Sequence, residues 1–327
     1  CYCKRSRDSM SESTIELILD TASRIFSDHC DKSLLDSCER AAPPENLWLL
    51  LKKNGFNQLG SDESGTSLSD MYEFLIECGR HAVPLPISET LLMNLWFGDV
   101  GEISGIGELR GDKVLNVSCG SAVNRVGVIE KGRESVRLIN DIEVLEKGYN
   151  LADESRDVLA FQGGDEVQVT IDPYAQMALT RVCLMAGCMQ TVLDLGVQFA
   201  SEREQFGRSI SKFQAIQHNL AIVACEVAAS RRAAQAAIDA LGDKRFVLEV
   251  AAAKSRVGEA AGLVAEQVHQ IHGAMGFTQE HRLHHYTKRL WAWRDEWGNE
   301  FYWQSLLGQD ISKLGADSVW SFIATSS

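Results

Sequence analysis

The stretch REQFGRSISKFQAIQH, residues 203–218, combines arginines, aromatic side chains, a glycine and amides within about four helical turns. An apolar stripe with helical spacing ends just before it, at Phe199, and another begins inside it. Gly207 is expected to break the first helix, and Ser209 or Ser211 is expected to cap the next one. The stretch therefore predicts a corner between two long helices.

Residues at such a corner can bind an anion. The Arg203 guanidinium can meet a phosphate with paired N–H groups, and the start of the following helix offers free backbone donors and a partial positive charge. Gln205 and Gln214 can add amide contacts to a ribose or a base. The structural alternative is a polar helix connection in which Phe206 and Phe213 are buried as core anchors.

A second glycine-containing segment, QIHGAMGFT at residues 270–278, ends a later apolar stripe. Gly273 and Gly276 would allow a ligand to approach the backbone closely. A helix C-cap followed by a turn explains the same glycines, and an isolated Gly-x-x-Gly is weak evidence for phosphate binding. Taken alone, this segment does not distinguish the two interpretations.

Apolar periodicity divides the chain into three regions. Residues 1–9 are interpreted as residues added for production or as an upstream remnant, and they are left out of the fold prediction. The fold class is predicted to be mainly α with a small β-domain. The regions are a helical part at 10–97 with helices over 13–35, 45–54 and 68–79, an antiparallel barrel or sandwich at 98–173, and a four-helix bundle at 174–327.

Composition restricts the partners. The chain has 45 acidic and 32 basic residues, and this excess of negative charge would repel a nucleic-acid backbone. Nine cysteines without a repeated Cys-x-x-Cys pair are typical of a reducing cytoplasm rather than of a disulfide framework. No uninterrupted apolar run approaches the roughly 18 residues that a membrane span requires. We therefore expect a cytoplasmic protein that binds neither nucleic acid nor membrane.

The segment EHRLHHYTKRLWAWRDEWG, residues 280–298, is rich in histidine and tryptophan. His281 and His285 stand about one helical turn apart, but neither a His-Glu-x-x-His pattern nor a cysteine accompanies them, so no metal site is predicted. No Gly-x-Ser-x-Gly, Walker-type or Gly-x-Gly-x-x-Gly motif is present, which excludes several common enzyme classes. The tryptophans of this segment and the one just beyond it are expected to fill an apolar interface: Trp291, Trp293, Trp297 and Trp303.

Together, the stretch at 203–218 and the later motif QIHGAMGFTQEH resemble the acyl-CoA dehydrogenase family. The segments LWLLLKKNGFNQLG and SLSDMYEFLIECGRHAVPLP are similar to that family's N-terminal helical domain, and the order of regions extends the resemblance over nearly all of residues 10–310. The resemblance implies an FAD-dependent oxidoreductase of lipid metabolism. In that chemistry a carboxylate base takes the α-proton of an acyl-CoA thioester while the β-hydrogen leaves as hydride to the flavin.

In this family FAD lies across a subunit boundary, with its flavin ring on one subunit's β-domain and its ADP half on a neighbour's C-terminal bundle. The resemblance implies that the stretch at 203–218 holds the ADP half. The implied cofactor-binding residues are Arg203 at the pyrophosphate, Gln205 and Phe206 in the same pocket, Phe213 and Gln214 beside the adenosine portion, and Gln270 with Gly273 on the opposite side.

The β region departs from the family pattern. Residues 110–132, RGDKVLNVSCGSAVNRVGVIEKG, contain neither Thr-Glu-Pro-x-x-Gly-Ser-Asp nor the Trp-x-Thr/Ser pair that holds the flavin. Trp297 stands where many members have a glutamate before a glycine, and Glu296 is one position early. Because one position on a helix turns a side chain by about 100°, Glu296 is a weak candidate base and the catalytic residues are unknown.

An ADP site without an evident flavin cradle or base is similar to the shorter subunit of bacterial mixed tetramers that act on steroid side-chain CoA thioesters. A longer acyl-CoA dehydrogenase subunit would then supply the flavin ring and the base, with an acyl-CoA as substrate and an electron-transfer acceptor as a further partner. Two alternatives stay open. One is a self-sufficient homotetramer that uses Glu296, and the other is a flavin-free structural subunit.

Overall fold

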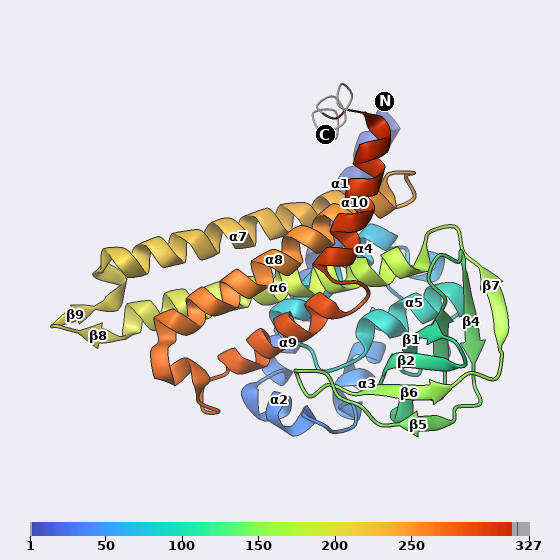
Figure 1. The fold of residues 1–327 in the computed structure, drawn as a ribbon, viewed down its shortest axis with the longest axis horizontal. Coiled ribbons are helices and arrows are strands. Elements are labelled where there is room, and N and C mark those ends of the chain that lie inside the picture. Colours follow the sequence, from blue (N-terminus) through green and yellow to red (C-terminus); the bar gives the residue numbers. More distant parts are fainter. Residues whose placement is uncertain (1, 316–318, 320–327) are drawn as a thin grey trace.

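The chain was analysed as a computed structural model, which describes residues 2–315 and 319. Helices near the N-terminus come first, a β-sheet follows, and long helices complete the chain. Figure 1 shows the sheet at one end of the molecule and three long helices that run away from it toward the other end. The predicted mainly α fold with a small β region is confirmed.

The N-terminal part contains five α-helices. They are α1 (Tyr2–His29), α2 (Lys32–Cys38), α3 (Glu45–Lys53), α4 (Leu68–Arg80) and α5 (Ile87–Phe97). Two of them follow the sequence signals closely, because Gly55 adopts a φ of 78° just after α3 and because Ser67 and Asp70 form a capping box at the start of α4.

The first predicted helix, over 13–35, is wrong at both ends. Helix α1 already includes residues that the sequence analysis set aside, and it ends at His29. The chain then turns, and the Asp31 side chain accepts a hydrogen bond from the Leu34 backbone N–H at 2.8 Å, which starts α2. Helix α5 was not predicted as a separate helix, since it is buried along most of its length and so lacks a polar face.

The β region is one seven-stranded sheet with the order β5-β6-β2-β1-β3-β4-β7. The antiparallel prediction fails at one pair, because the chain crosses over after the β1–β2 hairpin and pairs β3 with β1 in parallel. The strands are β1 (Gly105–Arg110), β2 (Lys113–Ser118), β3 (Val126–Ile129), β4 (Ser135–Ile139), β5 (Val144–Glu146), β6 (Arg156–Ala160) and β7 (Asp165–Gln168).

The C-terminal part is built on α6 (Pro173–Glu202), α7 (Gln214–Asp239) and α8 (Phe246–His272), followed by α9 (Leu283–Asp295) and α10 (Glu300–Leu314). Helix α6 packs against α4, α7, α8 and α9, so its predicted apolar stripe lies in the main core. By length and composition α6 could also cross a membrane, and a core helix passes the same test. It is the one such helix among the described residues.

Helices α4 and α6 cross at unusually close range. A methyl group added at Gly187 would lie 1.8 Å from the Ile76 carbonyl oxygen, and one added at Gly79 would lie 2.1 Å from the Leu184 carbonyl oxygen. The two glycines therefore let the backbones touch. This crossing fixes the N-terminal helices on the core helix of the C-terminal part.

Candidate functional site

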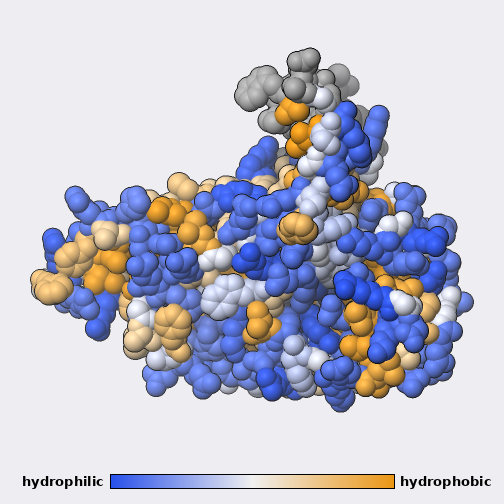
Figure 2. Space-filling view, viewed as in Figure 1, coloured by the Kyte–Doolittle hydropathy of each residue, from blue (hydrophilic) through white to orange (hydrophobic). Residues whose placement is uncertain are grey.

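The stretch at 203–218 forms the predicted corner. Helix α6 ends at Glu202, and the chain folds into a small hairpin of β8 (Glu204–Gln205) and β9 (Arg208–Ser209). Phe206 and Gly207 turn the hairpin with φ angles of 52° and 76°. In Figure 1 this hairpin is the end of the molecule farthest from the sheet, and Figure 2 shows apolar residues gathered there.

Five of the predicted residues line one surface depression, which we call the corner cleft. Its walls come from the end of α6, the hairpin, the start of α7 and the end of α8. The predicted residues among its lining are Arg203, Gln205, Phe206, Phe213 and Gly273. The other two, Gln214 on the first turn of α7 and Gln270 on the last turn of α8, are exposed and do not line the cleft.

Phe206 is not a core anchor, since 91% of its surface is exposed. Its ring lies edge-on to that of Phe213, with 6.2 Å between the centroids, and the Arg208 guanidinium lies 4.3 Å from the centroid of the Phe213 ring. The structural alternative of two buried phenylalanines is therefore wrong for Phe206. The Phe206 ring therefore belongs to the surface of the hairpin rather than to the core of this chain.

The corner cleft carries unused hydrogen-bond donors. The Arg203 guanidinium is exposed and makes no hydrogen bond or ion pair with another residue in the part of the chain that the structure describes. Phe213 is the N-cap of α7 and supplies no side-chain acceptor, so the first N–H groups of that helix are left free. The predicted serine cap of α7 is wrong, because Ser209 instead caps the short 3-10 turn at Ile210–Lys212.

His272 is a cleft residue that the sequence analysis missed. Its ring stacks on Phe199 with 4.3 Å between the centroids, and its Nδ1 donates to the Val268 carbonyl at 2.8 Å. Burial lowers its pKa to about 4, so the ring is neutral at pH 7 and Nε2 is an acceptor. Nε2 is buried and has no partner among the described residues. The only sequence signal that could have identified His272 as a cleft residue was its position next to Gly273.

Glu296 lies in a different place, on the loop after α9, where it is held by cations. Arg156 Nε donates to Glu296 Oε1 at 2.7 Å, and Arg181 Nε donates to Glu296 Oε2 at 2.7 Å. Arg181 also donates to Glu89 Oε1 at 2.7 Å, and Asn150 donates to Glu296 Oε1 at 2.9 Å. We call this cluster the ion network.

The ion network disfavours proton uptake by Glu296. Although burial opposes the charge, Arg156 and Arg181 lower the pKa of Glu296 to about 2. A general base at neutral pH works best with a pKa near 7, and both oxygens of Glu296 are already occupied. The geometry therefore describes a structural carboxylate rather than a base.

A cavity lies beside the ion network, at the junction of α5, α6, α9 and the sheet. Arg156, Arg181 and Glu89 form part of its wall, whereas Glu296 does not line it. We call it the inner cavity. Two arginines of its wall are already paired within the chain, because Arg181 is bonded to Glu89 and Arg289 Nε donates to Glu154 Oε1 at 3.0 Å.

The loop that carries Glu296 is held by Lys254 of α8. Its ammonium is buried and donates to the carbonyls of Arg294 at 2.6 Å and Gly298 at 2.9 Å. Trp297, which follows Glu296 on this loop, has a φ of 57°. Its ring packs edge-on against that of Tyr174, with 5.5 Å between the centroids. Trp293, Trp297 and Trp303 are buried inside this chain, so they are core residues rather than the predicted interface.

Residues 168–294 match the family model of the acyl-CoA dehydrogenase C-terminal domain. This part of the chain is an acyl-CoA dehydrogenase C-terminal domain. It contains the whole corner cleft and ends just before Glu296. FAD, the predicted cofactor, is the cofactor of this family.

A relative and two solved structures extend the likeness over the remaining chain. Acyl-CoA dehydrogenase IpdE2 of Mycolicibacterium smegmatis is 28% identical over 294 residues, which are 84% of this chain and 91% of the relative. A Tcur3481-Tcur3483 steroid ACAD variant has a TM-score of 0.81 at 20% identity and covers 93% of this chain and 99% of its own.

The second structure is the ChsE4-ChsE5 complex from Mycobacterium tuberculosis, with a TM-score of 0.80 at 17% identity, covering 92% of this chain and 98% of its own. At these identities the likeness concerns the fold. The chain as a whole therefore has the acyl-CoA dehydrogenase fold, as the sequence predicted.

Proposed function

We propose that this chain is a subunit of an FAD-dependent acyl-CoA dehydrogenase and contributes the ADP half of the FAD site to a longer partner subunit. The bound FAD would accept the β-hydrogen of an acyl-CoA thioester as hydride. The observation that carries the proposal is the Arg203 guanidinium, which has no partner among the described residues and stands beside the uncapped start of α7.

The corner cleft fits half of a dinucleotide chemically. Arg203 would pair with the diphosphate, and the free N–H groups at the start of α7 would add donors to an anion. The neutral Nε2 of His272 would accept a hydrogen bond from a ligand hydroxyl or amino group. Phe206 and Phe213 offer rings on which a flat base can pack.

The catalytic base that takes the α-proton, in contrast, is proposed to come from the partner subunit. Glu296 holds two buried arginines through both of its oxygens, which favours a role in folding over a role in proton transfer. The self-sufficient homotetramer that would use Glu296 is therefore the weaker alternative. The flavin-free structural subunit is also weaker, because assembly alone gives no reason for an unpaired arginine in a cleft beside the start of α7.

The names of similar proteins support a mixed assembly and a steroid-derived substrate. One similar structure is a steroid ACAD, and another is a complex of two different subunits. We therefore propose a heterotetramer that oxidises the acyl-CoA thioester of a steroid side chain. An electron-transfer acceptor would reoxidise the flavin.

The deciding experiment is native mass spectrometry of the intact assembly, after this chain is produced alone or together with a longer acyl-CoA dehydrogenase subunit from the same source. We expect a colourless or insoluble product from the chain alone and a yellow mixed complex from the pair. The mass spectrum should report both subunits and bound FAD. A yellow, active assembly of this chain alone would contradict the proposal.

A further inference from the structure

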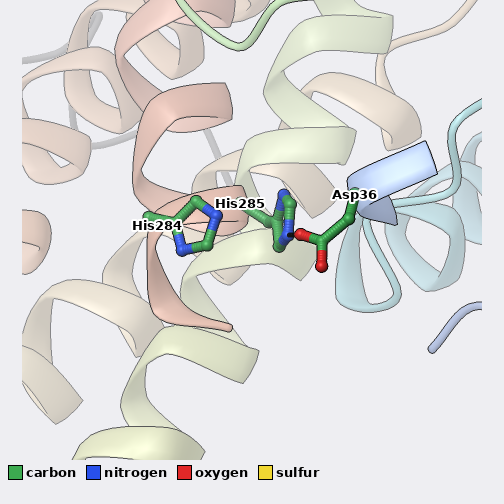
Figure 3. A group of neighbouring side chains, drawn as sticks. All are labelled: Asp36, His284 and His285. Carbon is green, nitrogen blue, oxygen red and sulfur yellow. Dashed lines mark hydrogen bonds and ion pairs between the residues drawn. The ribbon is translucent and has the colours of Figure 1, made fainter. Parts of the chain in front are cut away.

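Two histidines of α9 and an aspartate of α2 gather outside the corner cleft, since none of the three lines it. Figure 3 shows His284 and His285 side by side, with the Asp36 carboxylate next to the His285 ring. Each residue offers one ligand atom, and these atoms lie within 4.8 Å of one another. We propose that Asp36, His284 and His285 form a zinc site that ties α2 to α9.

The hydrogen bonds of both imidazoles direct their Nε2 atoms toward the site. His284 Nδ1 donates to the His281 carbonyl at 2.7 Å, which leaves Nε2 as the free nitrogen. His285 Nδ1 faces Glu39 Oε1 at 3.5 Å, and its Nε2 lies 2.8 Å from Asp36 Oδ1. Metal-bound histidines commonly give their other nitrogen to a carbonyl or a carboxylate in this way.

Two polar atoms beside the site are buried, and no hydrogen bond within the described residues accounts for their burial. His285 Nδ1 and Glu39 Oε1 are both buried and have no hydrogen-bond partner among the described residues. A metal on Nε2 would place the proton of His285 on Nδ1, where it can be donated to Glu39. The site would therefore use a pair of polar atoms that make no hydrogen bond with the described residues, although Lys288 Nζ faces Glu39 Oε1 at 3.5 Å.

The types of ligand suit zinc. Two imidazoles and one carboxylate form a common zinc donor set. A water can take the fourth position, because the side chain of Asp36 is partly exposed.

Binding requires small movements rather than a new fold. Zinc bonds of about 2.0 to 2.1 Å set tetrahedral ligand atoms about 3.4 Å apart. Asp36 Oδ1 would move slightly away from His285 Nε2, and His284 would move toward both. Lys32 holds the other carboxylate oxygen at 2.6 Å, so Oδ1 is the oxygen that faces the site. Lys32, Lys288 and Arg289 add positive charge around the ligands, and Glu39 adds negative charge.

This site differs from the histidine pair considered in the sequence. The His281 ring stands 4.7 Å from the His272 ring, at the end of the bundle, and only its backbone carbonyl supports His284. The aspartate comes from the N-terminal helices, so spacing within residues 280–298 could not reveal it. A metal here would also fix Cys38 and Glu39 at the end of α2, which line the inner cavity.

The test measures zinc itself and does not depend on flavin or activity. The full chain, in its purified assembly, is stripped with EDTA, desalted, given zinc chloride and desalted again, and its zinc is measured by mass spectrometry. We expect about one zinc per copy of this chain and a rise in Tm on adding zinc. Two variants, His284→Ala and Asp36→Asn, should retain at least tenfold less zinc and show no rise in Tm.

The matched control is His218→Ala, which removes an exposed histidine of α7 and should keep the zinc. The variants avoid His285 because its ring is buried and its loss could unfold the chain. Equal zinc retention in the parent and in His284→Ala, or no retention in the parent, would overturn the proposal. Neither result would bear on FAD binding at the corner cleft.

Discussion

Arg181 of α6 donates to Glu296 Oε2 at 2.7 Å and so joins the core helix to the loop after α9. The same guanidinium reaches Glu89 of α5, which makes it the centre of the ion network. Both partners come from elements far away in the sequence. The carboxylate that the sequence offered as a base is therefore part of the framework that holds three regions of the chain together.

The replacement Glu296→Gln should lower the free energy of unfolding by about 3 to 5 kcal/mol, because it removes the negative charge between two buried arginines. Urea unfolding of the parent and the variant measures this difference. The control Glu266→Gln changes an exposed carboxylate of α8 and should stay within about 0.5 kcal/mol. Unchanged stability of Glu296→Gln with loss of activity would instead support a base.

The ion network also predicts acid sensitivity. Burial opposes the charge of Glu89 and Glu296, but the neighbouring arginines lower both pKa values to about 2, below those of the unfolded chain. The unfolded chain then binds protons first as the pH falls, so acid favours unfolding. We expect stability to fall between about pH 5 and pH 2, by about 3 kcal/mol for each carboxylate. Denaturant titrations across this range check the prediction, and a flat profile would contradict it.

In the mixed complex, Arg203→Ala should weaken FAD binding by about tenfold to a hundredfold, the usual cost of losing hydrogen bonds to a charged group. Arg203→Lys should keep part of the affinity, since it retains the charge but not the paired geometry. Flavin absorbance per complex after desalting measures the loss. The control Arg232→Ala removes an exposed arginine of α7 and should leave the flavin content unchanged. Full flavin content in Arg203→Ala would argue for a structural subunit.

A methyl group at the crossing of α4 and α6 should be severely destabilising. Gly187→Ala would force the added carbon against the Ile76 carbonyl, at a cost of about 3 kcal/mol or more. Gly308→Ala is the matched control in α10, where nothing lies within 4 Å of the new methyl group. It should be neutral or stabilising by up to about 1 kcal/mol. Urea midpoints of both variants give the comparison, and equal midpoints would show that the helices separate easily.

Local signals predicted the elements whose ends are set by neighbouring residues. The helices predicted at 45–54 and 68–79 and the apolar stripes of the long helices all depend on short-range spacing. Helix α5 was not predicted, because burial on nearly all sides removes the polar face by which a helix is recognised in a sequence. The parallel pairing of β1 with β3 depends on a crossover that no alternation of residues encodes.

In the candidate site, too, the features set by neighbouring residues were predictable from the sequence, and those set by distant residues were not. The corner was predictable because Arg203, Gly207 and Phe213 stand within one short segment. The structural role of Glu296 was not predictable, since its partners Arg156 and Arg181 lie 140 and 115 positions away in the sequence. Aromatic residues are usually buried, so no sequence rule predicted the exposure of Phe206.

The exposed Phe206 ring has a consequence for how long an unassembled copy of the chain persists in a cell. In the proposed mixed complex the partner subunit would cover this ring. A newly made copy would then show an aromatic side chain at its tip until assembly, and chaperones and proteases select exposed apolar surface. Copies without a companion would be removed soon after synthesis. The cellular amount of this chain is then expected to follow the supply of its companion rather than the rate of its own translation.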